Sequence, residues 1–221
     1  MTIRERLHLT DRRTALLVRF LQVVMVAILL AGLWLGDLGV VVNAAVGLLV
    51  TLLPAVLERR YAFTMGVGLV LWITVAMFLH ALGTLPLPGL DFATLYSSTW
   101  WWDHVTHALS SSLVAGAAYA TTRALEEHTD YVYLPRRFMV VYLLVFVMAF
   151  GVLWELLEFY IGVVSQLLGS AEVLTQYGLG DTVLDLLYNT LGGLLVAIFG
   201  TAYLTGLSEQ LAMRMGGRST K

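Results

Sequence analysis

The chain has 221 residues, of which 59% are hydrophobic and 13% charged, and its formal net charge at pH 7 is −2. A mean hydropathy of +0.82 corresponds to more apolar surface than a soluble domain of this length could bury, so we predict an integral membrane protein. The absence of cysteine excludes disulfides, thiolate nucleophiles and cysteine-ligated metals.

The predicted fold class is all-α, with one transmembrane domain over residues 1–221. About 20 apolar residues cross the hydrocarbon as a helix, and six runs reach that length: 16–36, 38–57, 62–82, 101–122, 138–164 and 182–206. The first run is too long for the apolar core of a signal peptide, and no small-residue cleavage pattern follows it before Asp37. We therefore expect six spans joined by short connections, with the first span retained.

The basic residues predict the orientation of these spans. Positively charged loops stay in the cytoplasm, and a six-span arrangement places every Lys and Arg on the same side. Both termini should then be cytoplasmic. The residues concerned are Arg4, Arg6, Arg12, Arg13, Arg19, Arg59, Arg60, Arg123, Arg136, Arg137, Arg214, Arg218 and Lys221.

The first three runs contain few polar residues. Gly32-x-x-x-Gly36 predicts a close approach between helices, and Asp37 marks a tight turn into the second run. Asn43 is expected to make a structural hydrogen bond rather than to contact a ligand. His80, near the outer end of the third run, is a candidate to support a site without binding its ligand.

The later runs carry three groups of polar residues that the predicted topology brings to one depth. Asp103, His104 and His107 open the fourth run, Glu155 and Glu158 lie in the last third of the fifth, and Asp181, Asp185 and Asn189 open the sixth. At about 1.5 Å per residue, each group lies roughly 0–12 Å below the extracytoplasmic boundary. Since each group also shares one helix face, we predict that the three groups meet.

Small residues continue the polar face of the fourth run toward the cytoplasm. His107 is followed on this face by Ser111, Ala115 and Ala118, whereas helical phase places Ala120 on the opposite side. Small side chains allow backbones to approach closely. We therefore expect this stripe to face neighbouring helices.

The cluster has five carboxylates and no nearby Lys or Arg, so it must bind cations or hold protons. Mixed Asp, Glu and His ligation suits a divalent metal such as Zn, Mn or Fe(II). We predict three roles. The metal ligands would come from Asp103, His104, His107, Asp181 and Asp185. The general base or further ligands would come from Asp103, Glu155 and Glu158, and the supporting residues would be Ser111, Asn189 and His80.

At these positions the chain resembles the VanZ-like and YjdF-like families of small bacterial and archaeal membrane proteins. The resemblance covers about the last three runs and rests on three motifs: Asp103-x-x-x-His107, Glu155-Leu-Leu-Glu158 and Asp181-x-x-x-Asp185-x-x-x-Asn189-Thr-Leu-Gly192-Gly193. Glutamate at 158, where VanZ-like members often have glutamine, favours the YjdF-like branch. The resemblance implies a multi-pass protein of a prokaryotic plasma membrane with one outward-facing polar site, and it implies no particular reaction.

Our leading hypothesis is a metal-dependent membrane enzyme that acts on a lipid or lipid-linked substrate near the extracytoplasmic leaflet. Two alternatives stay open. One is a proton- or cation-coupled transporter using the same carboxylates, and the other is a non-catalytic lipid-binding or structural membrane protein. No nucleic-acid-binding motif occurs in the sequence, so nucleic acid is not an expected partner.

Overall fold

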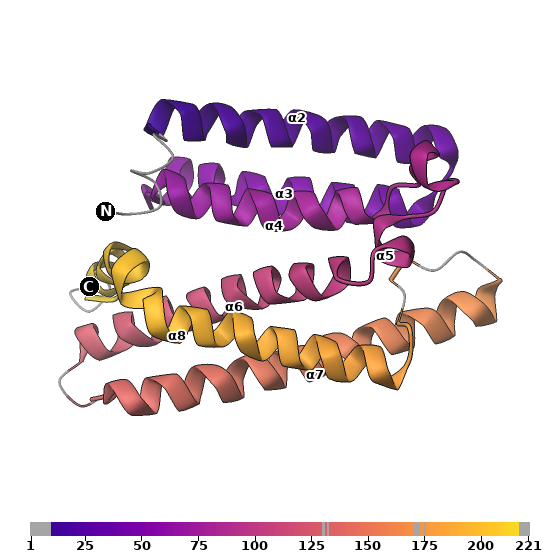
Figure 1. Cartoon of the computed structure of the whole chain (residues 1–221). Helices are drawn as coiled ribbons and strands as arrows, with labels where there is room; N and C mark the ends of the chain where they lie inside the picture. The colour runs from indigo at the N-terminus through magenta and orange to yellow at the C-terminus, as the bar shows by residue number, and fades with distance from the viewer. Residues whose placement is uncertain (1–9, 130, 132, 170–172, 175, 217–221) are drawn as a thin grey trace. The chain divides into compact units, whose positions relative to one another are not determined.

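The computed structural model describes residues 10–129, 131, 133–169, 173–174 and 176–216, except for the side chains of 201–203. All regular secondary structure in these ranges is helical (Figure 1). The chain divides into two compact units, one made of residues 1–102 and 164–174 and the other of residues 103–163 and 175–221.

The first unit contains three long helices that pack against one another: α2 (Asp11–Leu35), α3 (Leu38–Tyr61) and α4 (Val67–Thr84). Their shared apolar core is formed by Met25, Ile28, Val40, Ala44 and Ala81. A short 3₁₀ turn, η1 (Pro88–Leu90), and a one-turn helix, α5 (Leu95–Ser98), follow α4.

The turn between α2 and α3 is built by Gly36 and Asp37. Gly36 ends α2 in the left-handed region at φ 68°, which glycine adopts without a steric penalty. Asp37 caps α3, because its Oδ1 accepts a hydrogen bond from the Val40 amide at 3.1 Å. The turn predicted at Asp37 is confirmed. Of the two glycines predicted to allow close packing, Gly32 does so against Val40, while Gly36 ends the helix.

Asn43 makes the structural hydrogen bonds expected of it. Its Nδ2 donates to the carbonyl oxygens of Gly39 at 2.9 Å and Val173 at 3.1 Å. This side chain therefore ties α3 to the segment that follows α7 within the same unit.

The second unit is formed by α6 (Trp102–His128), most of α7 (Arg136–Leu168) and α8 (Leu179–Gly216). Going along α6, His104 meets Asp185, Ala108 meets Gly192 and Tyr119 meets Gly200, so α6 and α8 run in the same direction. Helix α7 runs opposite to both. Its contacts with α8 progress in reverse, with Gly151 beside Asn189 and Val147 beside Gly193.

Among the residues that the structure describes, five helices are long and apolar enough to cross a membrane: α2, α3, α4, α7 and the Leu179–Gly200 part of α8. The chain is thus an all-α, multi-pass membrane protein. Helix α6 has 27 residues, about 40 Å, but the imidazoles and serines of its first half make it less apolar than these five. That α6 crosses the membrane stays a prediction, and so does the cytoplasmic orientation of both termini, which depends on it.

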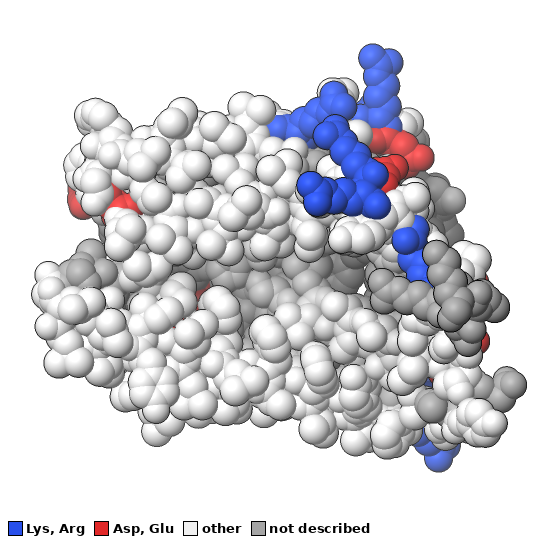
Figure 2. All heavy atoms as spheres, turned by 180° about the vertical axis from the view of Figure 1, so that it is seen from behind, with Lys and Arg blue, Asp and Glu red and all other residues white. Residues whose placement is uncertain are grey.

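The surface of the first unit fits membrane insertion. Arg12 and Arg13 at the start of α2 and Arg59 and Arg60 at the end of α3 lie at one end of this unit, and Arg19 follows about two turns further along α2. On the face drawn in Figure 2, the Lys and Arg side chains gather toward one end, and most of the remaining surface is uncharged. This separation places the basic residues at a headgroup level and leaves apolar side chains for the lipid tails.

The small-residue stripe of α6 is buried, since Ser111 is 6% exposed, Ala115 0% and Ala118 7%. Ala120, which helical phase places on the opposite side of α6, is also buried, with an exposure of 1%. Helical phase alone does not reveal how many sides of a helix are covered.

Close packing of α6 on α8 depends on Gly192. A Cβ added there would clash with the carbonyl oxygen of Ala108 and with Ser111 Oγ, and a backbone oxygen cannot rotate away. Gly192→Ala should therefore lower the free energy of unfolding in detergent by about 1–3 kcal/mol through overpacking. Gly206→Ala is the matched control in the same helix, because a Cβ there meets no atom within 4 Å. Equal stabilities of the two variants would contradict the packing described.

Candidate metal centre

One group of three side chains joins the beginning of α6 to the beginning of α8. Asp103, His107 and Asp185 each offer one ligand atom, and these atoms lie within 4.8 Å of one another. Asp103 and His107 are one helical turn apart on the same face, with Asp103 Oδ1 3.5 Å from His107 Nε2. His107 is 6% exposed and Asp185 1%, so the group is largely removed from solvent.

A second group adds two glutamates from α7. Glu155, Glu158 and the same His107 also offer ligand atoms within 4.8 Å of one another. The side chain of Glu155 is buried, and its Oε2 lies 3.5 Å from the amide nitrogen of Gln176. Its Oε1 is buried without a hydrogen-bond partner among the described residues. Such an oxygen is costly to bury unless something fills its coordination.

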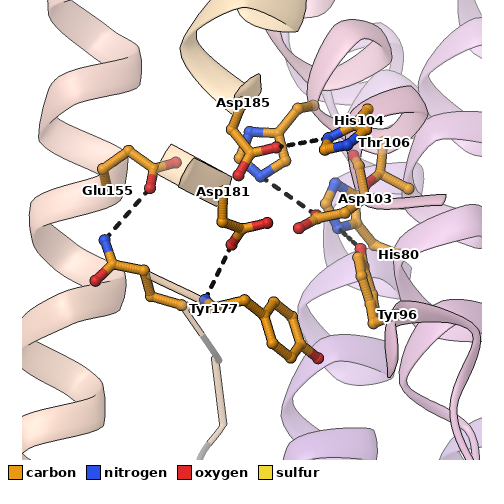
Figure 3. Close-up of polar contacts among 11 residues, drawn as sticks. His80, Tyr96, Asp103, His104, Thr106, Glu155, Tyr177, Asp181 and Asp185 are labelled. Atoms are coloured by element: carbon orange, nitrogen blue, oxygen red, sulfur yellow. Dashed lines mark hydrogen bonds and ion pairs between the residues drawn. The ribbon is translucent and has the colours of Figure 1, made fainter. Parts of the chain in front are cut away.

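Asp185 has its own imidazole partner (Figure 3). His104 Nδ1 lies 3.2 Å from Asp185 Oδ1, and both side chains are buried. Tyr188 stacks on the His104 ring, with ring centroids 4.8 Å apart and planes 8° from parallel. His104 thus orients Asp185, in the way that a neighbouring donor orients a metal-binding carboxylate. It belongs to neither of the two groups, and its role as a direct ligand stays a prediction.

The remaining predicted site residues have other contacts. Asp181, in the first turn of α8, accepts a hydrogen bond from the Tyr177 amide at 3.0 Å, a position in which the helix N-terminus favours a carboxylate. It lies outside both groups, and its role as a ligand also stays a prediction. Asn189 is buried beside Gly151, and Ser111 donates to the carbonyl oxygen of Ala108 at 3.1 Å.

His80 belongs to the first unit. Its Nδ1 is hydrogen bonded to the Tyr96 hydroxyl at 2.7 Å, which links α4 to α5. These contacts do not test the prediction that His80 supports the candidate metal centre.

Sequence reasoning missed Gln176, Thr182 and Tyr188. The Gln176 amide links Glu155 to Thr182, whose hydroxyl lies 2.9 Å away. Tyr188 could have been found, because it follows Asp185 by three residues and so shares its helix face. Gln176 lies between helices, where no periodicity indicates the direction of a side chain.

The arrangement suits a cation. Imidazole and carboxylate groups from three helices lie close together, and one of these carboxylates, Asp185, has the His104 imidazole as a partner. In the part of the second unit that the structure describes, the basic residues are Arg123, Arg136, Arg137 and Arg214. All four lie toward the opposite ends of α6, α7 and α8. Arg123, for example, lies about 24 Å from His107 along the α6 axis, so none of these four arginines neutralises the carboxylates.

The His104–Asp185 contact predicts a measurable coupling. In metal-free protein, His104→Phe should lower the free energy of unfolding by about 1–3 kcal/mol, because Asp185 stays buried and loses its described partner. Phenylalanine keeps a ring for stacking on Tyr188. His128→Phe, at an exposed position of the same helix, should change stability by less than about 0.5 kcal/mol. Unfolding in mixed micelles measures both, and similar losses would contradict the contact.

Comparison with known proteins places the whole transmembrane region in one family. No curated protein and no solved structure matches the chain. The model of a family described as predicted membrane proteins, DUF2238, matches residues 16–206, which includes the first three helices as well as the three that carry the candidate site. The chain therefore belongs to the DUF2238 family of predicted membrane proteins.

Proposed function

We propose that this chain is a metal-dependent membrane enzyme that acts on a lipid or lipid-linked headgroup at the extracytoplasmic leaflet. The observation that carries the proposal is the convergence of Asp103, His107 and Asp185 next to the Glu155 and Glu158 pair. Intramembrane ionisable groups are costly and are kept where they act on a ligand, an ion or a proton.

The ligand set favours a catalytic metal over a structural one. Asp103, His107 and Asp185 would supply three protein ligands and leave coordination positions for water and substrate, as catalytic metal sites do. One imidazole with two carboxylates suits Zn, Mn or Fe(II). A metal held in this way supplies an activated water or polarises a substrate oxygen.

A general base is available beside this set. Glu155 is buried, and the Gln176 amide donates a hydrogen bond to its Oε2. Its Oε1 has no hydrogen-bond partner among the described residues. An acceptor of this kind can take a proton from a water molecule within hydrogen-bond reach. Glu158, one turn further along α7, is the other candidate for this role.

The membrane placement of the site supports a lipid substrate. Residues 104–119 of α6 run alongside residues 185–200 of α8 in the same direction, and that part of α8 lies within a candidate span. A helix that runs beside a transmembrane helix over this length lies at the same depth in the membrane. We therefore propose that α6 is a sixth transmembrane span. Six spans place the basic residues in the cytoplasm and the site toward the outer leaflet. The predicted relation to VanZ-like and YjdF-like proteins agrees with this placement.

The metal prediction is tested by elemental analysis of purified, metal-replete protein. Wild type should retain a transition metal at a reproducible stoichiometry, and His107→Ala or Asp185→Asn should lose it while circular dichroism shows that the helices are intact. Occupancy should also fall on acidification, because protons compete for the ligands. His128→Ala, at an exposed position of α6, should have no effect. Absence of bound metal from wild type would refute the proposed mechanism and favour proton-coupled transport through the same carboxylates.

The topology is tested by cysteine labelling, for which the cysteine-free chain is suited. Ser97→Cys before α6 and Leu168→Cys at the end of α7, both at exposed positions, should react with an impermeant thiol reagent outside intact cells. His128→Cys at the end of α6 should react only after the membrane is opened. Labelling of position 128 from outside would show that α6 does not cross the membrane, and it would contradict the placement of the site toward the outer leaflet.

A further inference from the structure

The two metal-binding groups together contain more negative charge than one divalent cation can balance. Asp103, Asp185, Glu155 and Glu158 contribute four carboxylates around the shared His107, and the arginines that the structure describes in this unit lie at the far helix ends. One divalent cation would leave two carboxylates, in a site where His107, Asp185 and Glu155 are all buried, to be neutralised by protons or by a second cation. Uncompensated buried charge is strongly unfavourable. Two divalent cations would balance the four carboxylates.

The glutamate pair shows a second, independent sign of a missing ligand. Glu155 is 4% exposed, yet its Oε1 has no hydrogen-bond partner among the described residues. This glutamate is separate from the Asp103–His107–Asp185 group and comes from a different helix, α7. A cation filling only that first group would be coordinated without using Glu155.

We infer that Glu155 and Glu158 bind a second divalent cation beside the one held by Asp103, His107 and Asp185. The inference rests on the proposed function and adds a two-cation centre to it, in which the two glutamates are cation ligands in place of the general base. His107 Nε2 faces Asp103 at 3.5 Å and is assigned to the first cation. The second cation takes the two glutamates, one helical turn apart on the same face of α7, with water in its remaining positions.

The second position offers only oxygen ligands, which are hard donors, whereas the first also offers an imidazole nitrogen, which is a softer donor. Carboxylate oxygens and water are the donors that Mn²⁺ and Mg²⁺ prefer, whereas imidazole draws Zn²⁺ and Fe²⁺ more strongly. The two positions should therefore differ in affinity, and the glutamate position should release its cation first on dilution or acidification. Mn²⁺ can occupy both positions and is the probe of choice.

The number of bound ions in full-length, purified protein tests this inference. In equilibrium dialysis against Mn²⁺, wild type should bind two ions per chain, and Glu158→Gln or Glu155→Gln should bind one. Glu127→Gln, at an exposed position near the other end of α6, should keep two. The paramagnetic resonance spectrum of wild type should show two coupled Mn²⁺ ions, and either glutamine variant should show one isolated ion.

The outcomes separate this inference from the proposed function. One ion in wild type, unchanged in Glu158→Gln, would overturn the second cation and leave the single-metal enzyme standing. No ion in wild type would overturn both. Since the wild-type stoichiometry decides the first question by itself, a variant that fails to fold does not obscure the result.

Discussion

The burial of several carboxylates with no Lys or Arg beside them in the described part of the second unit is the constraint on which this unit depends. Asp185 and Glu155 are almost fully enclosed by helices whose other faces are apolar, and water is not present in the hydrocarbon to solvate them. Among the described residues, the His104 imidazole lies beside Asp185 and the Gln176 amide beside Glu155. His104 is stacked by Tyr188 and contacts Asp185, so part of the unit serves to hold one carboxylate in a fixed orientation. A cation is the simplest way to satisfy the rest.

Packing of the helices serves the same end. Gly192 lets α8 approach the backbone of α6 at Ala108, and Gly151 lets α7 approach Asn189 of α8. Small residues at such positions are the usual means by which membrane helices come close, since lipid tails are as apolar as the side chains and give no hydrophobic drive for association. The close approach occurs about one to two helical turns from Asp185, so the distance between the ligand-bearing side chains is set by the glycines below them.

The two units differ in what their polar residues do. In the first unit they complete helix ends and link neighbouring segments, as Asp37, Asn43 and the His80–Tyr96 pair do. In the second unit they converge on one another, and one buried carboxylate oxygen is left without a described partner. Membership of the DUF2238 family covers both units, so the family is defined by the whole helical assembly and not only by the half that carries the candidate site.

Much of this arrangement was already determined by the sequence. Apolar runs predict helices because every backbone group in a membrane must be bonded internally. Residues three or four apart share a helix face, which brought Asp103 together with His107, and Glu155 with Glu158. Contacts between residues far apart in the chain were decided only by the tertiary structure. Helical phase did not reveal that Ala120 would be buried, that His104 would contact Asp185 under the ring of Tyr188, or that Gln176 would reach Glu155 from a connecting segment. Periodicity describes one helix at a time, whereas burial and side-chain partners depend on which helices surround it.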